Sequence, residues 1–172
     1  HRGGVTTIAD AGFGGMALPE REIEVLAQVH EGDHVPFRQY LIPQVGTFKR
    51  VYGDEAEDRM AALSEHASER IRFLDAGKFF ADGAFIAQLM QLGEPGYIDG
   101  HEGAWMAEPD RIVRHVRPCW NTGKQVHVHV NGDLGMDATL DAIAELQAEM
   151  PRFDHRTVLH HFGVTTQAQS RR

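Results

Sequence analysis

A chain of 172 residues with 42% hydrophobic and 24% charged side chains has a globular composition and is long enough for one ordinary domain with a core. No apolar run approaches the roughly 18 residues of a membrane span. The formal charge of −8 disfavours a nucleic-acid or anionic-membrane partner, which would need a basic face. The single cysteine, Cys119, excludes an internal disulfide and is expected to be a core thiol. With no secretory-signal pattern near the first residues, it favours a cytoplasmic protein.

Apolar, β-branched segments alternate with helical patterns along the chain. The expected strands are Gly4–Ala11, Arg38–Val45, Arg72–Asp82, Gln125–Asn131 and Arg156–His161. Their starts are roughly 31 to 53 residues apart, which is typical of parallel strands joined by helical crossovers.

Four segments between these strands have helical spacing of apolar residues. They are Pro19–His30, Asp54–Arg70, Pro109–Trp120 and Asp137–Met150. The second has the clearest apolar stripe, and Pro118 is expected to bend or end the third early. The segment Gly83–Ala107 is Gly-rich and lacks periodicity, and a loop of this length is more often functional than a simple connector.

The pattern predicts an α/β fold with about five β-loop-α units. Five units are too few to close an eight-stranded barrel, so we expect one incomplete domain over residues 1–172, a part of a (β/α)8 TIM-type barrel. Open strand edges would then favour association into a homo-oligomer. The alternative is an open doubly wound sheet that is complete as it stands.

The most informative feature is a pair of strand ends that carry histidines. In the sequence QVHVHVNGD, His127 and His129 point to the same side of the strand, because side chains alternate. His129 is nearer the carboxyl end, where the reactive groups of a barrel collect. A lone strand histidine is more often structural, but the Asn-Gly-Asp that follows ends the strand and supplies Asp133, which could orient a ligand. His127 is interpreted as a supporting or core residue.

The second strand end, RTVLHHFG, carries His160 and His161. Adjacent strand residues face opposite ways, so at most one of the two is expected to point at a given centre. His161, the last before Phe-Gly, is the better candidate, and His160 is expected to face the helix layer or to make a supporting hydrogen bond.

Lys78 enters an apolar strand that ends at Asp82-Gly83. A lone lysine at a strand start commonly extends its amine to water. The alternative is a buried amine with a lowered pKa, which can react with carbon dioxide to give a carbamate that bridges two metal ions. Asp82 and Asp133 could be general acid–base groups or could orient the ligands, and we favour the second role.

These segments, GVTTIADAG, KFFADGA, VHVHVNGD and RTVLHHFG, resemble in order and spacing the amidohydrolase superfamily. Within it they are most similar to the amidohydrolase 3 branch, whose members hydrolyse cyclic amides, formamides and related C–N bonds. The resemblance covers essentially the whole chain. It implies strands two to six of a metal-dependent (β/α)8 barrel, with a divalent ion such as zinc, one or two per site, and a small amide-type substrate.

The resemblance implies three catalytic residues that are also metal ligands. Lys78 matches the carboxylated lysine, His129 the strand-five ligand and His161 the strand-six ligand. Metal-activated water would then be the nucleophile.

The chain departs from the family in three ways. His160 stands where the branch has Glu, the first-strand His-x-His pair would precede Gly4, and the last-strand Asp would follow Arg172. His127-x-His129 is not that first-strand pair, because Lys78 would then precede it, against the family order. We therefore expect little turnover from this chain in isolation. The rival hypotheses are a non-catalytic remnant with a binding or structural role, and an unrelated doubly wound α/β protein whose histidines are incidental.

Overall fold

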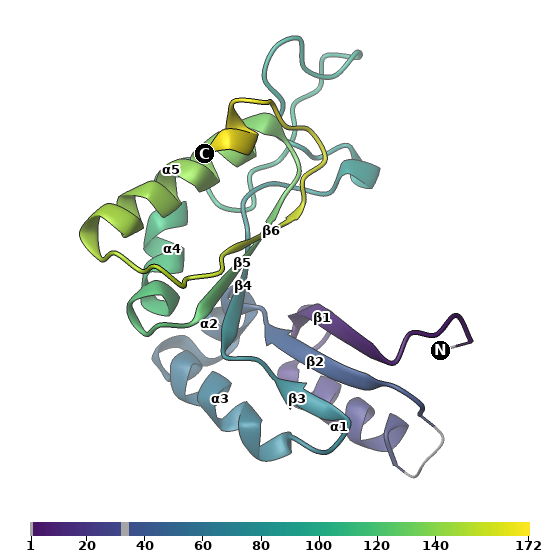
Figure 1. Cartoon of the computed structure of the whole chain (residues 1–172). Coiled ribbons are helices and arrows are strands. Elements are labelled where there is room, and N and C mark those ends of the chain that lie inside the picture. Colours follow the sequence, from purple (N-terminus) through teal and green to yellow (C-terminus); the bar gives the residue numbers. More distant parts are fainter. Residues whose placement is uncertain (1, 32–34) are drawn as a thin grey trace. The chain divides into compact units, whose positions relative to one another are not determined.

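The computed structural model describes residues 2–31 and 35–172, which form two compact units, His1–Lys78 and Phe79–Arg172 (Figure 1). Both are built from parallel strands and helices, as the alternating pattern predicts. The α/β fold class is therefore confirmed. Within the described residues, no helix is both long enough and apolar enough to span a bilayer.

The first unit holds a parallel sheet in the order β1-β2-β3. Its elements are β1 (Thr7–Phe13), α1 (Pro19–Val29), β2 (Arg38–Pro43), α2 (Val45–Tyr52), α3 (Ala56–Ala62) and β3 (Ile71–Phe73), with 3₁₀ turns at Gly53–Glu55 and Leu63–His66. Phe13, Leu41, Phe48 and Ile71 form its core, and the rings of Phe13 and Phe73 meet edge-on at 5.3 Å.

The second unit holds the functional strand ends. β4 (Ala76–Phe80) leads into it, followed by α4 (Pro109–Asn121), β5 (Gln125–Val130), α5 (Asp133–Glu149) and β6 (Val158–His161), with 3₁₀ turns at Phe85–Ala87 and Gln169–Arg171. The sheet order is β4-β5-β6, with β5 and β6 parallel, and α4 and α5 pack together beside β5 (Figure 1). Trp120 and Cys119 of α4 are buried, as expected for the thiol.

One predicted strand is in fact two. The segment Arg72–Asp82 is divided into β3 and β4, because the chain turns at Leu74, whose carbonyl accepts a hydrogen bond from Ala76 N at 2.8 Å. β3 pairs with β2, whereas β4 belongs to the sheet of β5 and β6. The turn separates Lys78 from the apolar residues of β3.

The helix predicted over Asp54–Arg70 is wrong in its extent. Only α3, Ala56–Ala62, is α-helical, and the chain is extended at Ala67. Beyond the 3₁₀ turn at Leu63–His66, the Ser68 hydroxyl accepts hydrogen bonds from Arg70 N and Ile71 N and so competes with helical bonding at the end of the predicted segment. Pro118 lies inside α4, and less than a full turn of the helix follows it. The helix continues to Asn121, so it does not end at Pro118.

The helix α2 was not predicted, because its Gly and β-branched residues have weak helix propensity. Burial of Val45 and Phe48 against the first unit's core stabilises it instead.

Candidate functional site

Four histidines from β5 and β6 lie side by side in the second unit. The rings of His129 and His161 are 4.4 Å apart between centroids, and those of His127 and His160 are 5.1 Å apart. His127 Nδ1 and His160 Nε2 are 2.9 Å apart and share a hydrogen bond. His127 and His129 are buried, His160 is half-buried and His161 is exposed. The cluster is thus open to solvent at the His161 end.

The backbone at the end of β6 explains how both adjacent histidines reach this cluster. In the ladder His160 is opposite His129 and His161 is opposite Val130, so regular alternation would turn His161 away. His161 and Phe162 instead have φ of 77° and 57°, in the left-handed region, which ends the alternation. Each of the two rings therefore contacts a histidine of β5, His160 with His127 and His161 with His129, and the expectation that at most one of them points at a given centre stays a prediction.

Asn131 was interpreted only as the end of the strand, yet it is the residue that holds His129. It is fully buried, and its side-chain Nδ2 lies 3.1 Å from Gly83 O and 3.0 Å from His129 Nε2. A carbonyl oxygen can only accept, so the amide NH₂ donates to both atoms. In this arrangement His129 Nε2 is an acceptor. The motif Asn-Gly-Asp after a histidine strand is the sequence signal for such a residue.

Asp82 joins three segments of the second unit. Its carboxylate is fully buried and accepts hydrogen bonds from Asn131 N at 2.8 Å, Gly132 N at 2.6 Å and Gln91 N at 3.0 Å. The acceptor therefore fixes the end of β5 and the start of α5 against the long loop after β4. These contacts make Asp82 an acceptor for backbone N–H groups, and its role in orienting a ligand stays a prediction.

Asp133 is the first residue of α5 and holds the same loop from the other side. Its Oδ1 accepts a hydrogen bond from Gly93 N at 2.9 Å, and Leu134 N donates to Gln91 O at 3.1 Å. A carboxylate in the first turn is also favoured by the helix dipole. Asp82 and Asp133 thus anchor the loop beside the histidines.

Lys78 lies on β4 and is only 2% exposed, so the hypothesis that it extends to water is wrong. It forms an isolated parallel bridge with Gln44, which follows β2. Burial lowers the pKa of its amine to about 8. A lysine in this state is neutral far more often than a surface lysine and can act as a nucleophile.

The convergence of Lys78 with His129 and His161 stays a prediction, as do the roles of Asp82, Asp133, His127 and His160. Within residues 2–31 and 35–172, no three His, Cys, Asp or Glu side chains are grouped to hold a metal ion. The rings of His129 and His161 meet edge to face at the ends of β5 and β6.

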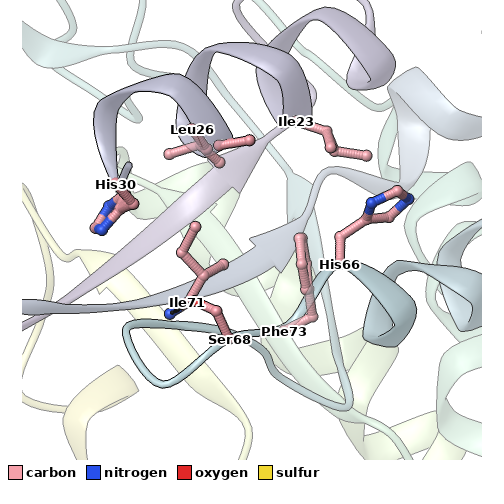
Figure 2. Close-up of a pocket in the computed structure, with 8 residues that line it drawn as sticks. Ile23, Leu26, His30, His66, Ser68, Ile71 and Phe73 are labelled. Atoms are coloured by element: carbon pink, nitrogen blue, oxygen red, sulfur yellow. Dashed lines mark hydrogen bonds between the residues drawn. The ribbon is translucent and has the colours of Figure 1, made fainter. Parts of the chain in front are cut away.

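The first unit has a separate pocket of about 190 Å³ between α1 and β3 (Figure 2). Ile23 and Leu26 of the helix and Ile71 and Phe73 of the strand supply its apolar lining, with His30 and His66 at its ends (Figure 2). His30 Nε2 pairs with Gln39 Oε1 at 3.0 Å. Its mainly apolar lining has no cluster of acidic or metal-binding groups, so we do not assign the chemistry to it.

The chain is similar to known hydrolases over most of its length. A family model described as "Amidohydrolase family" matches residues 1–172. The chain is 29% identical over 143 residues to a Bacillus subtilis (strain 168) protein named "Putative amidohydrolase YtcJ". The match covers 83% of this chain and 25% of that protein, so the chain spans about a quarter of its relative's length.

Two solved structures share the fold. Both are uncharacterised metal-dependent hydrolases, one from Pyrococcus furiosus with a TM-score of 0.54 and 22% identity, the other from Pyrococcus horikoshii OT3 with a TM-score of 0.51 and 18% identity. The matches cover 82% and 81% of this chain, and 27% and 26% of those structures.

Proposed function

The chain belongs to the amidohydrolase family, and we propose that it is part of a metal-dependent hydrolase that cleaves C–N bonds of small amide-type substrates. The observation that carries the proposal is the pairing of His129 with His161 at the ends of neighbouring parallel strands. We also propose that the chain is strands two to six of a (β/α)8 barrel, with β3 and β4 together counted as strand four. In support, the chain shares its fold with proteins named as metal-dependent hydrolases.

The donor set fits a divalent ion. Imidazole nitrogens are common zinc ligands, and the two rings lie side by side at the solvent-facing end of the cluster. We propose that His129 and His161 hold one ion and that zinc is the metal, with a second ion where Lys78 is carboxylated. When bound, such an ion supplies Lewis acidity and lowers the pKa of water toward neutrality.

Asn131 and Asp82 together hold His129 in place. The Asn131 amide orients the imidazole, while Asp82 fixes the Asn131 backbone. Groups that hold a ligand in place are commonly as important to metal affinity as the ligand's own identity. Metal binding through Nε2 of His129 would require the Asn131 amide to move aside.

Lys78 is proposed as the third ligand, in its carboxylated form. Its amine, with a pKa of about 8, would attack carbon dioxide, so that an N–C bond forms and one proton is released. The product is an anionic carbamate with two oxygen donors. Because side chains alternate along a strand, Lys78 is expected on the face of β4 that carries Phe80, whose ring packs on His129 at 4.9 Å.

The test uses the full-length protein, assayed for bound metal and for amide hydrolysis. His129→Ala and His161→Ala should each lower metal content and reduce hydrolysis by at least about 100-fold, because second-sphere losses alone cost about 10–100-fold. Lys78→Ala should remove one of two ions, with partial recovery when acetate is added. His66→Ala, which changes an exposed histidine outside the cluster, is the matched control.

Full metal content and full hydrolysis in His161→Ala would show that His161 is not a ligand, with His160 the next variant to test. If all three variants keep their bound metal and their hydrolysis, the rival proposal is favoured, which is a non-catalytic binding or structural module. Cytoplasmic location and homo-oligomer formation through strand edges are further proposals, which fractionation and light scattering test directly.

A further inference from the structure

The segment Gln88–Gln91 is neither helix nor strand, yet the backbone of each residue in it is held by hydrogen bonds. Gln88 O accepts from His101 Nε2 at 2.8 Å, and Leu89 O accepts from Gly83 N and Ala104 N, both at 3.0 Å. Met90 N donates to the Tyr97 hydroxyl at 2.9 Å. Gln91 N donates to Asp82, and Gln91 O accepts from Leu134 N.

Three glycines allow other parts of the second unit to approach this segment closely. A Cβ at Gly103 would lie 1.9 Å from Met90 O, and one at Gly132 would lie 2.0 Å from Gln91 O. A Cβ at Gly83 would lie 2.3 Å from Leu89 Cβ. Any larger residue would force the backbone apart, so the path of the segment is fixed by packing as well as by hydrogen bonding.

A ring stack on the outer side of the loop completes the support. Tyr97 and His101 lie nearly parallel at 4.0 Å between centroids, and His101 Nδ1 is 2.6 Å from Asp99 Oδ1. The Tyr97 hydroxyl accepts a hydrogen bond from Met90 N, and His101 Nε2 donates one to Gln88 O. The stack therefore ties both ends of Gln88–Met90 to the rest of the loop.

Within this segment, the Met90 side chain lies near the residues that follow β5 and β6. Its Sδ lies 3.4 Å from the place where a Cβ of Gly163 would be, next to Asn131 Oδ1, which is 3.3 Å from the same place. Asn131 contacts His129, and Gly163 follows His161 by two residues. Met90 is half-buried.

We propose that Met90 is a specificity-determining residue: its side chain forms an apolar wall of the histidine site and favours substrates with an apolar group next to the bond that is cleaved. This inference rests on the proposed function. A rigidly held backbone is what a selective wall requires, because a mobile one would adapt to any substrate. A methionine offers an unbranched, polarisable surface for alkyl or aromatic groups.

The size of the effect follows from hydrophobic burial. Each methylene that moves from water onto such a wall improves binding by up to about fourfold. A hexanoyl group has four methylenes more than an acetyl group, so partial contact should still give at least about tenfold preference. Methionine would also serve as a simple gap filler in a core, and that role would give no preference among ligands.

The experiment follows binding of acetate, butyrate and hexanoate, which resemble the acid products of amide hydrolysis, to the full-length protein. Methyl-¹³C methionine labelling reports on all six methionines of the chain. Hexanoate should shift the Met90 methyl signal and leave that of Met16, which is 95% exposed, in place. Met90→Ala should reduce the hexanoate-over-acetate preference at least threefold, whereas Met90→Leu should largely keep it and Met16→Ala should not change it.

An unchanged chain-length preference in Met90→Ala, with no movement of the Met90 signal, would overturn the proposal even if His129→Ala abolished hydrolysis. Conversely, a Met90 signal that hexanoate moves in a protein with no amide hydrolysis would keep the wall and reject the proposed function. The kcat/KM ratio for the 4-nitroanilides of hexanoate and acetate should fall in Met90→Ala in parallel with the binding ratio.

Discussion

Removal of the Asp82 carboxylate should destabilise the second unit strongly, because three N–H groups depend on it, two of them buried and that of Gln91 part-buried. Oδ1 accepts from Asn131 N, while Oδ2 accepts from both Gly132 N and Gln91 N. In Asp82→Asn one of these oxygens becomes an NH₂ group that faces a donor. A buried donor that loses its partner costs about 1–3 kcal/mol, so we expect about 2–4 kcal/mol for Asp82→Asn and about 3–5 kcal/mol for Asp82→Ala.

Urea denaturation followed by tryptophan fluorescence measures this loss in the unit concerned. The chain has two tryptophans, Trp105 and Trp120, and both lie in the second unit. Trp105 forms a bridge with Asp82 itself, and Trp120 is fully buried in α4. The midpoint should fall without a large change in slope, because the surface exposed on unfolding stays the same.

Asp137→Asn is the matched control, since Asp137 lies on the exposed side of α5 near Arg172 and should change stability by less than about 0.5 kcal/mol. A loss below about 1 kcal/mol in Asp82→Asn would refute the reasoning. It would mean that water reaches the three N–H groups, and hence that the loop after β4 is not fixed to the end of β5.

Two further predictions concern the same loop. Gly132→Ala places a methyl group against Gln91 O and should increase proteolysis of residues 83–107 relative to Gly46→Ala, which has open space and no positive φ; equal cleavage of the two would contradict the close approach. The hydrogen bond to the Gln88 carbonyl, followed by that to Asp99, raises the pKa of His101. A raised folded-state pKa adds stability that is complete below the ordinary value and is lost as the pH rises through the folded value. The advantage of the natural protein over His101→Gln in unfolding free energy should therefore be larger at about pH 5.5 than at about pH 9; a pH-independent difference would contradict it.

The sequence predicts the strands of the site better than the helices around it. Alternation in QVHVHV places His127 and His129 on one face, and the structure keeps them buried there. The parallel order also follows from the spacing of the strands. The segment Asp54–Arg70 does not form one helix to its end, because the Ser68 hydroxyl competes for the backbone N–H groups there. The periodicity of apolar residues does not reveal such a competing hydrogen bond.

The contacts of the loop are beyond what a pattern of residues can predict. Asp82 follows a strand and could be an acid, a base or an anchor from its position alone. Its role as an acceptor of three N–H groups depends on where residues 91, 131 and 132 come together, which only the fold decides. The sequence does contain one sign of these contacts, which is the number of glycines around the loop. Gly83, Gly103 and Gly132 each lie where another part of the backbone approaches closely.

The end of β6 shows why irregular backbone concentrates at this site. Left-handed conformations at two successive residues other than glycine, His161 and Phe162, cost on the order of 1–3 kcal/mol each. The hydrogen bonds from Phe162 N to Val130 O and from Val164 N to Asn131 O hold the chain beside β5 and offset part of that cost. An extended continuation would be cheaper, but it would turn the His161 ring away from His129. The strain therefore accompanies the contact of the His161 ring with His129, which is the pair that the proposed metal site requires.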